Sequence, residues 1–439
     1  MALNLSKITG IDSNIAATLA FRGWSILAGG ILLIIVPIYL SPEEQGYYFT
    51  FASIIATQVF FELGFNYVIV QMIGHESAGL KYSSQGVLSG DKLNLVRVYS
   101  LITMLKKWYL YISMSFFIIV SLSGYYFFSI KGTLPVSEWF FSWALLVFFS
   151  ALNLFISPFL SVLEGIGLVG KVAKVRLIQS VIGYLGLFLL MFLGFGLNAI
   201  PILSFSTAFV SIYWIFIYHR NLFFHGISNS ENAISWKYDI FPFQWRIAVS
   251  WLSGYFIFQL FNPVIFSYQG EIEAGKIGLT LTLFTSMLSL SMSWVTAKTP
   301  TMAKFVALNQ RAELNSLFKN VVLKSGMANL FVMAIFFMAV QLLAFFNYPL
   351  TARIANVDAI VVLMLVSIAN HAIFCAAAYM RAHKEEPMML NSVVTGILNA
   401  IGIIFFAKWS SFAVLACYAT IVILLCLPWT FCTLRRYYH

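Results

Sequence analysis

Charged residues are scarce in this sequence. Only 10% of its 439 residues are Asp, Glu, Lys or Arg, whereas 61% are hydrophobic, and the mean hydropathy is +0.88. A soluble domain needs polar side chains to cover its surface, and this chain has too few for the two or three domains that its length allows. Lipid is therefore the expected solvent, and the soluble enzyme classes are excluded.

Cysteine is also rare, and the sequence lacks CxxC pairs and His residues at metal-ligand spacing. The four cysteines, which lie in or at the end of late apolar runs, are Cys375, Cys417, Cys426 and Cys432. We expect them to be small buried hydrophobes. The sequence also lacks a nucleophile-base arrangement and a Gly-rich phosphate loop. We therefore expect no metal, no cofactor and no direct use of ATP.

Long apolar runs are abundant instead. A helix needs about 20 apolar residues to cross the hydrocarbon core. Twelve runs meet that length, at about 16–40, 47–73, 108–130, 139–163, 177–195, 199–218, 247–268, 277–297, 321–346, 358–380, 388–406 and 410–432. The first run is too long for a signal-peptide core and no cleavage site follows it, so we expect it to stay in the mature protein.

The Lys and Arg residues are unevenly distributed between these runs. With a cytoplasmic N-terminus, 21 of them fall inside, Arg22 falls within the first run, and only Lys131, Lys276, Arg353 and Lys408 fall outside. This bias predicts a multi-pass protein of the bacterial inner membrane with both termini in the cytoplasm. The net charge of +10 therefore orients the chain toward anionic membrane lipids, and it is no sign of nucleic-acid binding.

The external connections are short, the longest being about 347–357. A membrane polymerase or glycosyltransferase usually needs a large external loop for its catalytic groups. The sequence offers none, which favours a transporter over an enzyme.

The two halves of the chain show weak internal similarity. Glu44 and Gly46, after the first apolar run, match Glu273 and Gly275, after the seventh, with the same spacing within each pair. An even number of spans in each half gives both halves the same orientation, as in a parallel repeat. We therefore predict an all-α polytopic protein with two six-helix lobes around a central cavity. The lobes are residues 1–218 and 247–439, and a cytoplasmic linker, 219–246, joins them.

Several short motifs resemble those of a transporter family. They are Leu40-Ser41-Pro42, Glu44-x-Gly46-Tyr47, Glu62-Leu63-Gly64-Phe65 and Glu164-Gly165-x-Gly167. Together with the hydropathy of the whole chain, they resemble the Wzx-type O-antigen flippases, which transport polysaccharide lipids and belong to the multidrug/oligosaccharidyl-lipid/polysaccharide exporter superfamily. The resemblance implies an alternating-access flippase for an undecaprenyl-diphosphate-linked oligosaccharide. It also implies a polysaccharide polymerase and a chain-length regulator as candidate partners.

Polar residues inside the apolar runs are the candidate site residues, because they are costly in lipid. Gln58, Glu62 and Asn66 recur every four residues in the second run, and Ser289 and Ser293 do so in the eighth. A one-sided polar stripe is typical of a helix that lines a cavity. Hydrogen bonding between helices is the alternative explanation for such a stripe.

Four further candidates, Arg22, His371, Gln259 and Asn262, concern charge and helix bending. The constant rise of a helix places Arg22 and Glu62 at depths that permit pairing, so Arg22 is a candidate for binding diphosphate and Glu62 for taking up a proton. A static ion pair is the alternative. His371 is a second candidate for ion coupling, with a neutral, hydrogen-bonded His as the alternative. Gln259 and Asn262 precede Pro263, which should bend the seventh helix.

The sequence leaves two other functions open. A multidrug or small-metabolite exporter of the same fold would need a narrower and more apolar cavity. A membrane-embedded acyltransferase or polymerase would need His with Asp or Glu near one membrane interface, and His371 alone gives that function little support.

Overall fold

The apolar runs of the sequence form long helices. The computed structural model describes residues 13–83, 86–224, 234–383 and 387–438. Eleven helices of this part are long and apolar enough to cross a membrane, and a bent pair, Pro42–Glu62 with Phe65–Glu76, makes up to twelve. The predicted all-α polytopic fold is therefore confirmed. The middle of the predicted linker, 225–233, lies outside the described residues.

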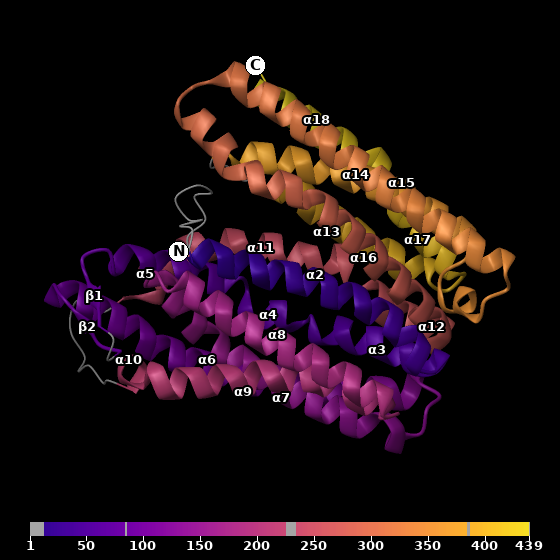
Figure 1. Cartoon of the computed structure of the whole chain (residues 1–439), viewed down its shortest axis with the longest axis horizontal. Helices are drawn as coiled ribbons and strands as arrows, with labels where there is room; N and C mark the ends of the chain where they lie inside the picture. The colour runs from indigo at the N-terminus through magenta and orange to yellow at the C-terminus, as the bar shows by residue number, and fades with distance from the viewer. Residues whose placement is uncertain (1–12, 84–85, 225–233, 384–386, 439) are drawn as a thin grey trace, which may run out of the picture. The chain divides into compact units, whose positions relative to one another are not determined.

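The chain packs as two compact units. Unit 1 comprises Met1–Ile35, Ile55–Ile130 and Leu134–Trp251. Its elements are most of α2 (Ser13–Tyr39), α4 (Gln58–Glu62), α5 (Phe65–Glu76), β1 (Lys81–Tyr82), β2 (Leu88–Ser89), α6 (Lys92–Lys131), α7 (Val136–Gly165), α8 (Val169–Phe192), η1 (Gly196–Ala199), α9 (Pro201–Tyr218), α10 (Arg220–Phe224), η2 (Trp236–Ile240) and the start of α11 (Phe241–Phe258) (Figure 1). The two short strands pair antiparallel, with Lys81 opposite Ser89.

Unit 2 comprises Val36–Ile54, Lys131–Thr133 and Leu252–His439. Its elements are α3 (Pro42–Ile55), α12 (Phe261–Gln269), α13 (Glu271–Ala307), α14 (Arg311–Phe345), η3 (Pro349–Arg353), α15 (Val357–Arg381), α16 (Met389–Phe406), α17 (Ser411–Thr420), η4 (Ile421–Cys426) and α18 (Leu427–Tyr438). Long loops are nearly absent from the described part of this unit, so neighbouring helices pack along most of their length.

One helix forms the centre of each unit. In α7 of unit 1 and in α15 of unit 2, 61% of the most apolar 18-residue stretch of the helix is buried. This share is larger than in any other span of the described chain. The large side chains Trp139 and Trp143 of α7 are at most 1% exposed. α7 and α15 are the fourth and tenth spans, which the internal repeat treats as equivalent, so the burial pattern agrees with that repeat.

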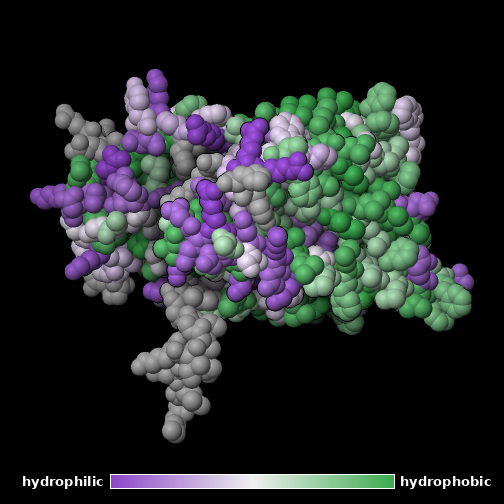
Figure 2. Space-filling view, turned by 90° about the horizontal axis from the view of Figure 1, so that it is seen from above, coloured by the Kyte–Doolittle hydropathy of each residue, from purple (hydrophilic) through white to green (hydrophobic). Residues whose placement is uncertain are grey.

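The remaining spans expose much of their apolar surface. Exposed Phe, Leu, Ile and Trp side chains occur along most of them, and hydrophobic residues cover a broad part of the face shown in Figure 2. A soluble monomer rarely exposes so much contiguous apolar surface. This surface is the part of each helix that is suited to contact with lipid.

Two helices are broken near residues that the sequence singled out. The second span is interrupted between α4 and α5, where Leu63 and Gly64 both have positive φ, at 53° and 67°, and the helix bends by 44°. The seventh span is interrupted before α12, because the ring of Pro263 excludes the carbonyl of the residue four positions earlier, Gln259. The interruption lies in the turn that precedes the proline, and Gln244–Gln269 continues as one span across it, so the bend expected from Pro263 stays a prediction.

Within unit 2, α3 packs against α13 with no side chain between the two backbones. A Cβ atom on Gly46 would lie 2.0 Å from the backbone oxygen of Glu271. Gln45 Nε2 donates to the carbonyl oxygens of Gly275, at 2.9 Å, and Arg353, at 3.0 Å. Arg353 Nη2 in turn donates to the Leu40 carbonyl at 2.8 Å. These bonds satisfy buried backbone oxygens where the two helices meet.

Candidate functional site

Unit 1 contains a cavity of about 820 Å³ with polar residues on several of its walls. Three of its walls are helical faces, and on each of them polar residues follow a spacing of three or four. They are Asn153, Ser157, Ser161 and Glu164 of α7, Arg176, Gln179, Ser180 and Tyr184 of α8, and Thr207 and Ser211 of α9. This spacing places the polar residues of each helix on one face, so amide and hydroxyl groups of three helices face the cavity, beside apolar side chains such as Ile156, Leu160 and Trp251.

The side chain of Asn153 is held in position on the α7 wall. Its Nδ2 donates to the carbonyl oxygen of Ser204 at 2.9 Å, while its Oδ1 is buried without a hydrogen-bond partner among the described residues. The neighbouring hydroxyl of Ser157 donates to a carbonyl of its own helix, that of Leu154, at 2.9 Å. The Ser157 oxygen is therefore left as an acceptor for a ligand that brings O–H or N–H groups, whereas Asn153 Oδ1 lies buried behind the cavity surface.

Gln179 links α8 to α9 behind this wall. The side-chain Nε2 of Gln179 donates to Ser211 Oγ at 2.5 Å, and the backbone carbonyl oxygen of Gln179 accepts from Ser206 Oγ at 3.0 Å. Gln179 is 5% exposed, and the two serines are at most 2% exposed. Because buried polar groups that are fully paired hold their geometry, this network fixes the spacing between the two walls.

Glu164 and Arg176 are the charged groups of the cavity lining. Arg176 Nη1 lies 3.0 Å from Glu164 Oε1, and the side chains are 39% and 16% exposed. Glu164 is the penultimate residue of α7, and Arg176 lies two turns into α8. The pair therefore lies at the end of the cavity next to the α7–α8 turn, where Lys171 and Lys174 also lie.

Gln58, Glu62 and Asn66 gather around the break between α4 and α5. Gln58 and Asn66 line the cavity, and their polar groups lie near enough to the Glu62 carboxylate to interact with it. Tyr109 OH donates weakly to Asn66 Oδ1 at 3.4 Å. The predicted stripe is thus brought together, although Glu62 itself is not among the lining residues.

Arg22 is not brought to this group. Its side chain is exposed on α2, and it forms no ion pair with Glu62 within the described part of the chain. The neighbouring residues of the same helix, Phe21 and Ser25, line the cavity in its place. The pairing that the sequence permitted by depth is therefore not formed.

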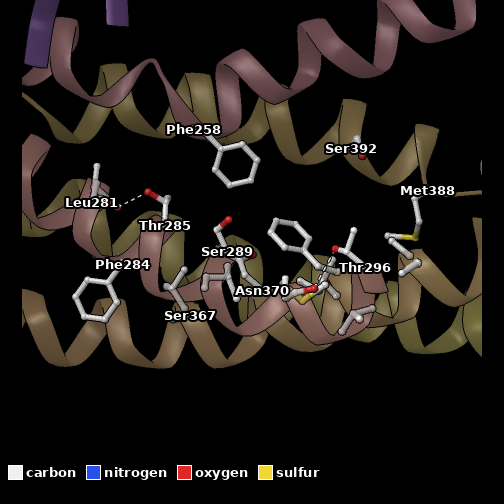
Figure 3. Close-up of a pocket in the computed structure, with 18 of the residues that line it drawn as sticks. Phe258, Leu281, Phe284, Thr285, Ser289, Thr296, Ser367, Asn370, Met388 and Ser392 are labelled. Atoms are coloured by element: carbon white, nitrogen blue, oxygen red, sulfur yellow. Dashed lines mark hydrogen bonds between the residues drawn. The ribbon is translucent and has the colours of Figure 1, made fainter. Parts of the chain in front are cut away.

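Unit 2 contains a second cavity, of about 690 Å³, with a mostly apolar lining. Phe258, Phe261, Leu288, Met292, Val366 and Phe374 provide much of that lining. In Figure 3, Thr285 and Ser289 point from α13 toward the space beside Phe258, and Ser392 and Met388 border the same space. The hydroxyl of Thr285 donates to the carbonyl of Leu281 at 2.9 Å, so it presents an acceptor to the cavity.

The two predicted serines of α13 have different surroundings. Ser289 lines the cavity of unit 2. Ser293, one turn later, is exposed outside this cavity, and its hydroxyl donates to the Leu290 carbonyl at 2.6 Å. The stripe therefore faces the cavity at the first of these two positions.

His371 lies in a buried polar cluster beside the cavity of unit 2. It is 5% exposed, and its Nε2 lies 2.8 Å from Ser325 Oγ and 3.5 Å from Cys375 Sγ. Its neighbour Asn370 lines the cavity and donates to Tyr418 OH at 3.1 Å. His371 is therefore one residue removed from the cavity wall.

Gln259 and Asn262 lie in unit 2, away from the lining of its cavity. Asn262 Nδ2 donates to Ser53 Oγ at 3.0 Å and to the Phe49 carbonyl at 3.4 Å. Ser53 is 1% exposed. Gln259 lies in the interruption between α11 and α12. Neither residue lines the cavity of this unit.

The polar stripe of α7 and the Glu164–Arg176 pair were missed from the sequence. The spacing of Asn153, Ser157 and Ser161 is the same four-residue period that singled out the second and eighth spans. The same rule, applied to the fourth apolar run, would have found it. Among the described residues, no group of three His, Cys, Asp or Glu side chains could hold a metal ion.

The fold resembles that of solved membrane transporters. A multidrug resistance MATE family transporter of the MOP superfamily, in an inward-facing conformation, gives a TM-score of 0.66 at 16% identity, over 97% of this chain and 98% of that chain. The lipid II flippase MurJ, in an inward closed conformation, gives 0.63 at 13% identity over 96% and 87%. A MOP superfamily transporter from Pyrococcus furiosus gives 0.56 at 15% identity over 98% and 96%. No protein-family model and no curated protein matches the sequence. The chain therefore has the fold of the MOP superfamily transporters.

Proposed function

We propose that this protein is a flippase that moves an undecaprenyl-diphosphate-linked oligosaccharide, such as an O-antigen repeat unit, across the bacterial inner membrane by alternating access. The observation that carries the proposal is the lining of the unit 1 cavity. Amide and hydroxyl groups from three helices face one space, and Glu164, the one acid of its lining in the part of the chain that the structure describes, is already paired with Arg176.

Such a lining suits a neutral sugar. Sugar hydroxyls both donate and accept hydrogen bonds. The Ser157 hydroxyl gives its proton to the Leu154 carbonyl, so its oxygen presents an acceptor for such O–H groups in the wall. A cationic substrate would find no unpaired carboxylate on this wall.

The distribution of Lys and Arg supports cytoplasmic ends for the α5–α6 and α7–α8 turns. In that orientation the Glu164–Arg176 end of the cavity faces the cytoplasm, where the lipid-linked substrate is made. Glu62 and His371 remain the candidates for ion coupling. The polymerase that would use the flipped oligosaccharide and its chain-length regulator remain candidate partners.

A small-molecule exporter is the second candidate, and the unit 2 cavity favours it. That cavity is lined mainly by Phe, Leu, Val and Met side chains, and such linings are typical of sites for apolar molecules.

Proteoliposomes distinguish the two functions. We expect a lipid-linked oligosaccharide to become accessible to a membrane-impermeant glycosidase without ATP, and we expect Asn153→Leu and Gln58→Leu to slow this flipping. Ser293→Ala, outside both cavities, is the matched control. Export of an apolar dye without any flipping of the oligosaccharide would contradict the proposal and favour the exporter.

A further inference from the structure

The Glu164–Arg176 pair occupies the charged end of an otherwise neutral cavity. Among the described residues, Arg176 is the one Lys or Arg that lines this cavity, and Glu164 is the one acid. From Arg176, the α8 wall continues through Gln179 and Ser180 to Tyr184, so a neutral polar face extends from the charged end along the helix.

The contact between the two side chains leaves most of the guanidinium unused. The closest approach is between Arg176 Nη1 and Glu164 Oε1, at 3.0 Å. A guanidinium carries five N–H donors in a planar fork, and a bidentate partner uses two of them at once. Arg176 therefore keeps donors for a second oxyanion that approaches from the cavity.

The surroundings of Arg176 favour negative charge. Lys171 and Lys174 are exposed on the same first turns of α8, whereas Arg176 and Gln179 turn inward to the cavity. Cations at the N-terminal end of a helix oppose the helix dipole. Their accumulation here makes this end of the cavity electropositive once Glu164 is displaced.

From these observations we infer that Arg176 binds the diphosphate of the substrate and that Glu164 is its internal competitor. This inference rests on the proposed function and names the residues that recognise the charged linkage. In the empty cavity Glu164 neutralises a guanidinium that would be costly to leave unpaired. When the ligand enters, its phosphate oxygens replace the carboxylate on the guanidinium, and the adjoining sugar faces Gln179, Ser161 and Asn153.

A short polyprenyl diphosphate and the matching alcohol test for this site. Both adsorb through the same apolar chain, but only the first carries the diphosphate. We would measure the dissociation constants of farnesyl diphosphate and of farnesol for the full chain in nanodiscs of neutral lipid. We expect Arg176→Gln to weaken the diphosphate by about tenfold or more, as for a lost hydrogen bond to a charged group, and to leave farnesol unchanged. Arg176→Lys should retain part of the affinity, because it keeps the charge without the fork.

A Glu164 variant distinguishes a competitor from a structural ion pair, because the two roles predict opposite changes in the affinity for farnesyl diphosphate. Glu164→Gln removes the competitor, so it should tighten farnesyl diphosphate several-fold, whereas a structural pair predicts weaker binding or misfolding. Arg97→Gln is the matched control, because it breaks the Arg97–Glu76 pair, at 2.8 Å, away from the cavity. A double Lys171→Gln, Lys174→Gln variant tests the surface lysines.

Several outcomes would overturn the inference. These are equal diphosphate affinity in wild type and Arg176→Gln, farnesol binding as tightly as farnesyl diphosphate, or a loss of binding that appears only in the Lys171, Lys174 double variant. If wild type flips the oligosaccharide while these results are seen, the inference fails and the proposed function stands. If Arg176 binds the diphosphate but no flipping occurs, the proposed function fails and the anion site stands.

Discussion

Gly46 of α3 and Gly275 of α13 lie in direct backbone contact. A Cβ atom on Gly275 would lie 2.9 Å from the Gly46 nitrogen and 3.2 Å from its Cα atom. These two glycines are also the pair that the sequence treats as equivalent positions of its two halves. Both glycines belong to unit 2, so equivalent positions of the two sequence halves meet within one compact unit.

The closeness of this contact predicts that Gly46→Ala destabilises the protein. The new methyl group would lie 2.0 Å from the backbone oxygen of Glu271, and backbone moves less readily than a side chain. Overpacking of this kind costs about 1–3 kcal/mol. The melting temperature in nanodiscs should fall accordingly. Gly254→Ala, also in unit 2 but with open space around its position, is the control, and an equal melting temperature for both variants would contradict the close packing.

The membrane spans could be predicted from the sequence because length and hydropathy alone determine them. The run predicted at 139–163 is α7, Val136–Gly165, and the run at 358–380 is α15, Val357–Arg381. The rule works because a helix satisfies its own backbone polar groups, so no other part of the chain is needed to form it in lipid.

The details of the site depend on tertiary contacts, and the sequence predicted them less well. The stripe of Gln58, Glu62 and Asn66 assumed a continuous helix, whereas the chain breaks at Leu63 and Gly64. The Glu164–Arg176 pair spans the ends of two apolar runs, where a charge usually indicates a solvated turn. That the two side chains meet at a cavity depends on how α7 packs against α8 and α9, and spacing within one helix does not reveal this.

The different positions of Ser289 and Ser293 give a test of the unit 2 cavity. Ser289→Trp should fill part of its space and reduce the transport of any molecule that binds there by about tenfold or more, as overpacking also forces the lining apart. Ser293→Trp, one turn further along α13 and exposed, should transport as wild type does. Initial rates of dye export and of oligosaccharide flipping, at matched protein levels, would measure both. Equal rates in the two variants would show that this cavity takes no part in transport.

His371→Gln separates a coupling role from a structural one. Glutamine can keep a hydrogen bond to Ser325 Oγ, which lies 2.8 Å from His371 Nε2, but it does not titrate between pH 5 and 8. If His371 couples transport to protons, as proposed, the variant should retain its fold and lose the dependence of flipping rate on pH in that range. His383→Gln, outside the membrane spans, should keep the wild-type profile. An unchanged profile in His371→Gln would leave Glu62 as the remaining coupling candidate.

The final prediction concerns His219, which follows α9 and contacts the β1 strand. Tyr82 OH lies 2.5 Å from His219 Nδ1. Burial, with a smaller contribution from Lys171, lowers the pKa of His219 from 6.5 to about 4. The unfolded chain therefore binds a proton more readily than the folded protein between these two values, so this contribution to stability is complete above about pH 6.5 and is lost as the pH falls toward about 4. We expect His219→Phe to lower the melting temperature at pH 7, through loss of the bond to Tyr82, but to flatten its decline between pH 6.5 and 4.5. His75→Gln, at a side chain 88% exposed, should leave the wild-type decline intact. A His219→Phe variant with the same decline as wild type would show that carboxylates, and not His219, cause the loss of stability in acid.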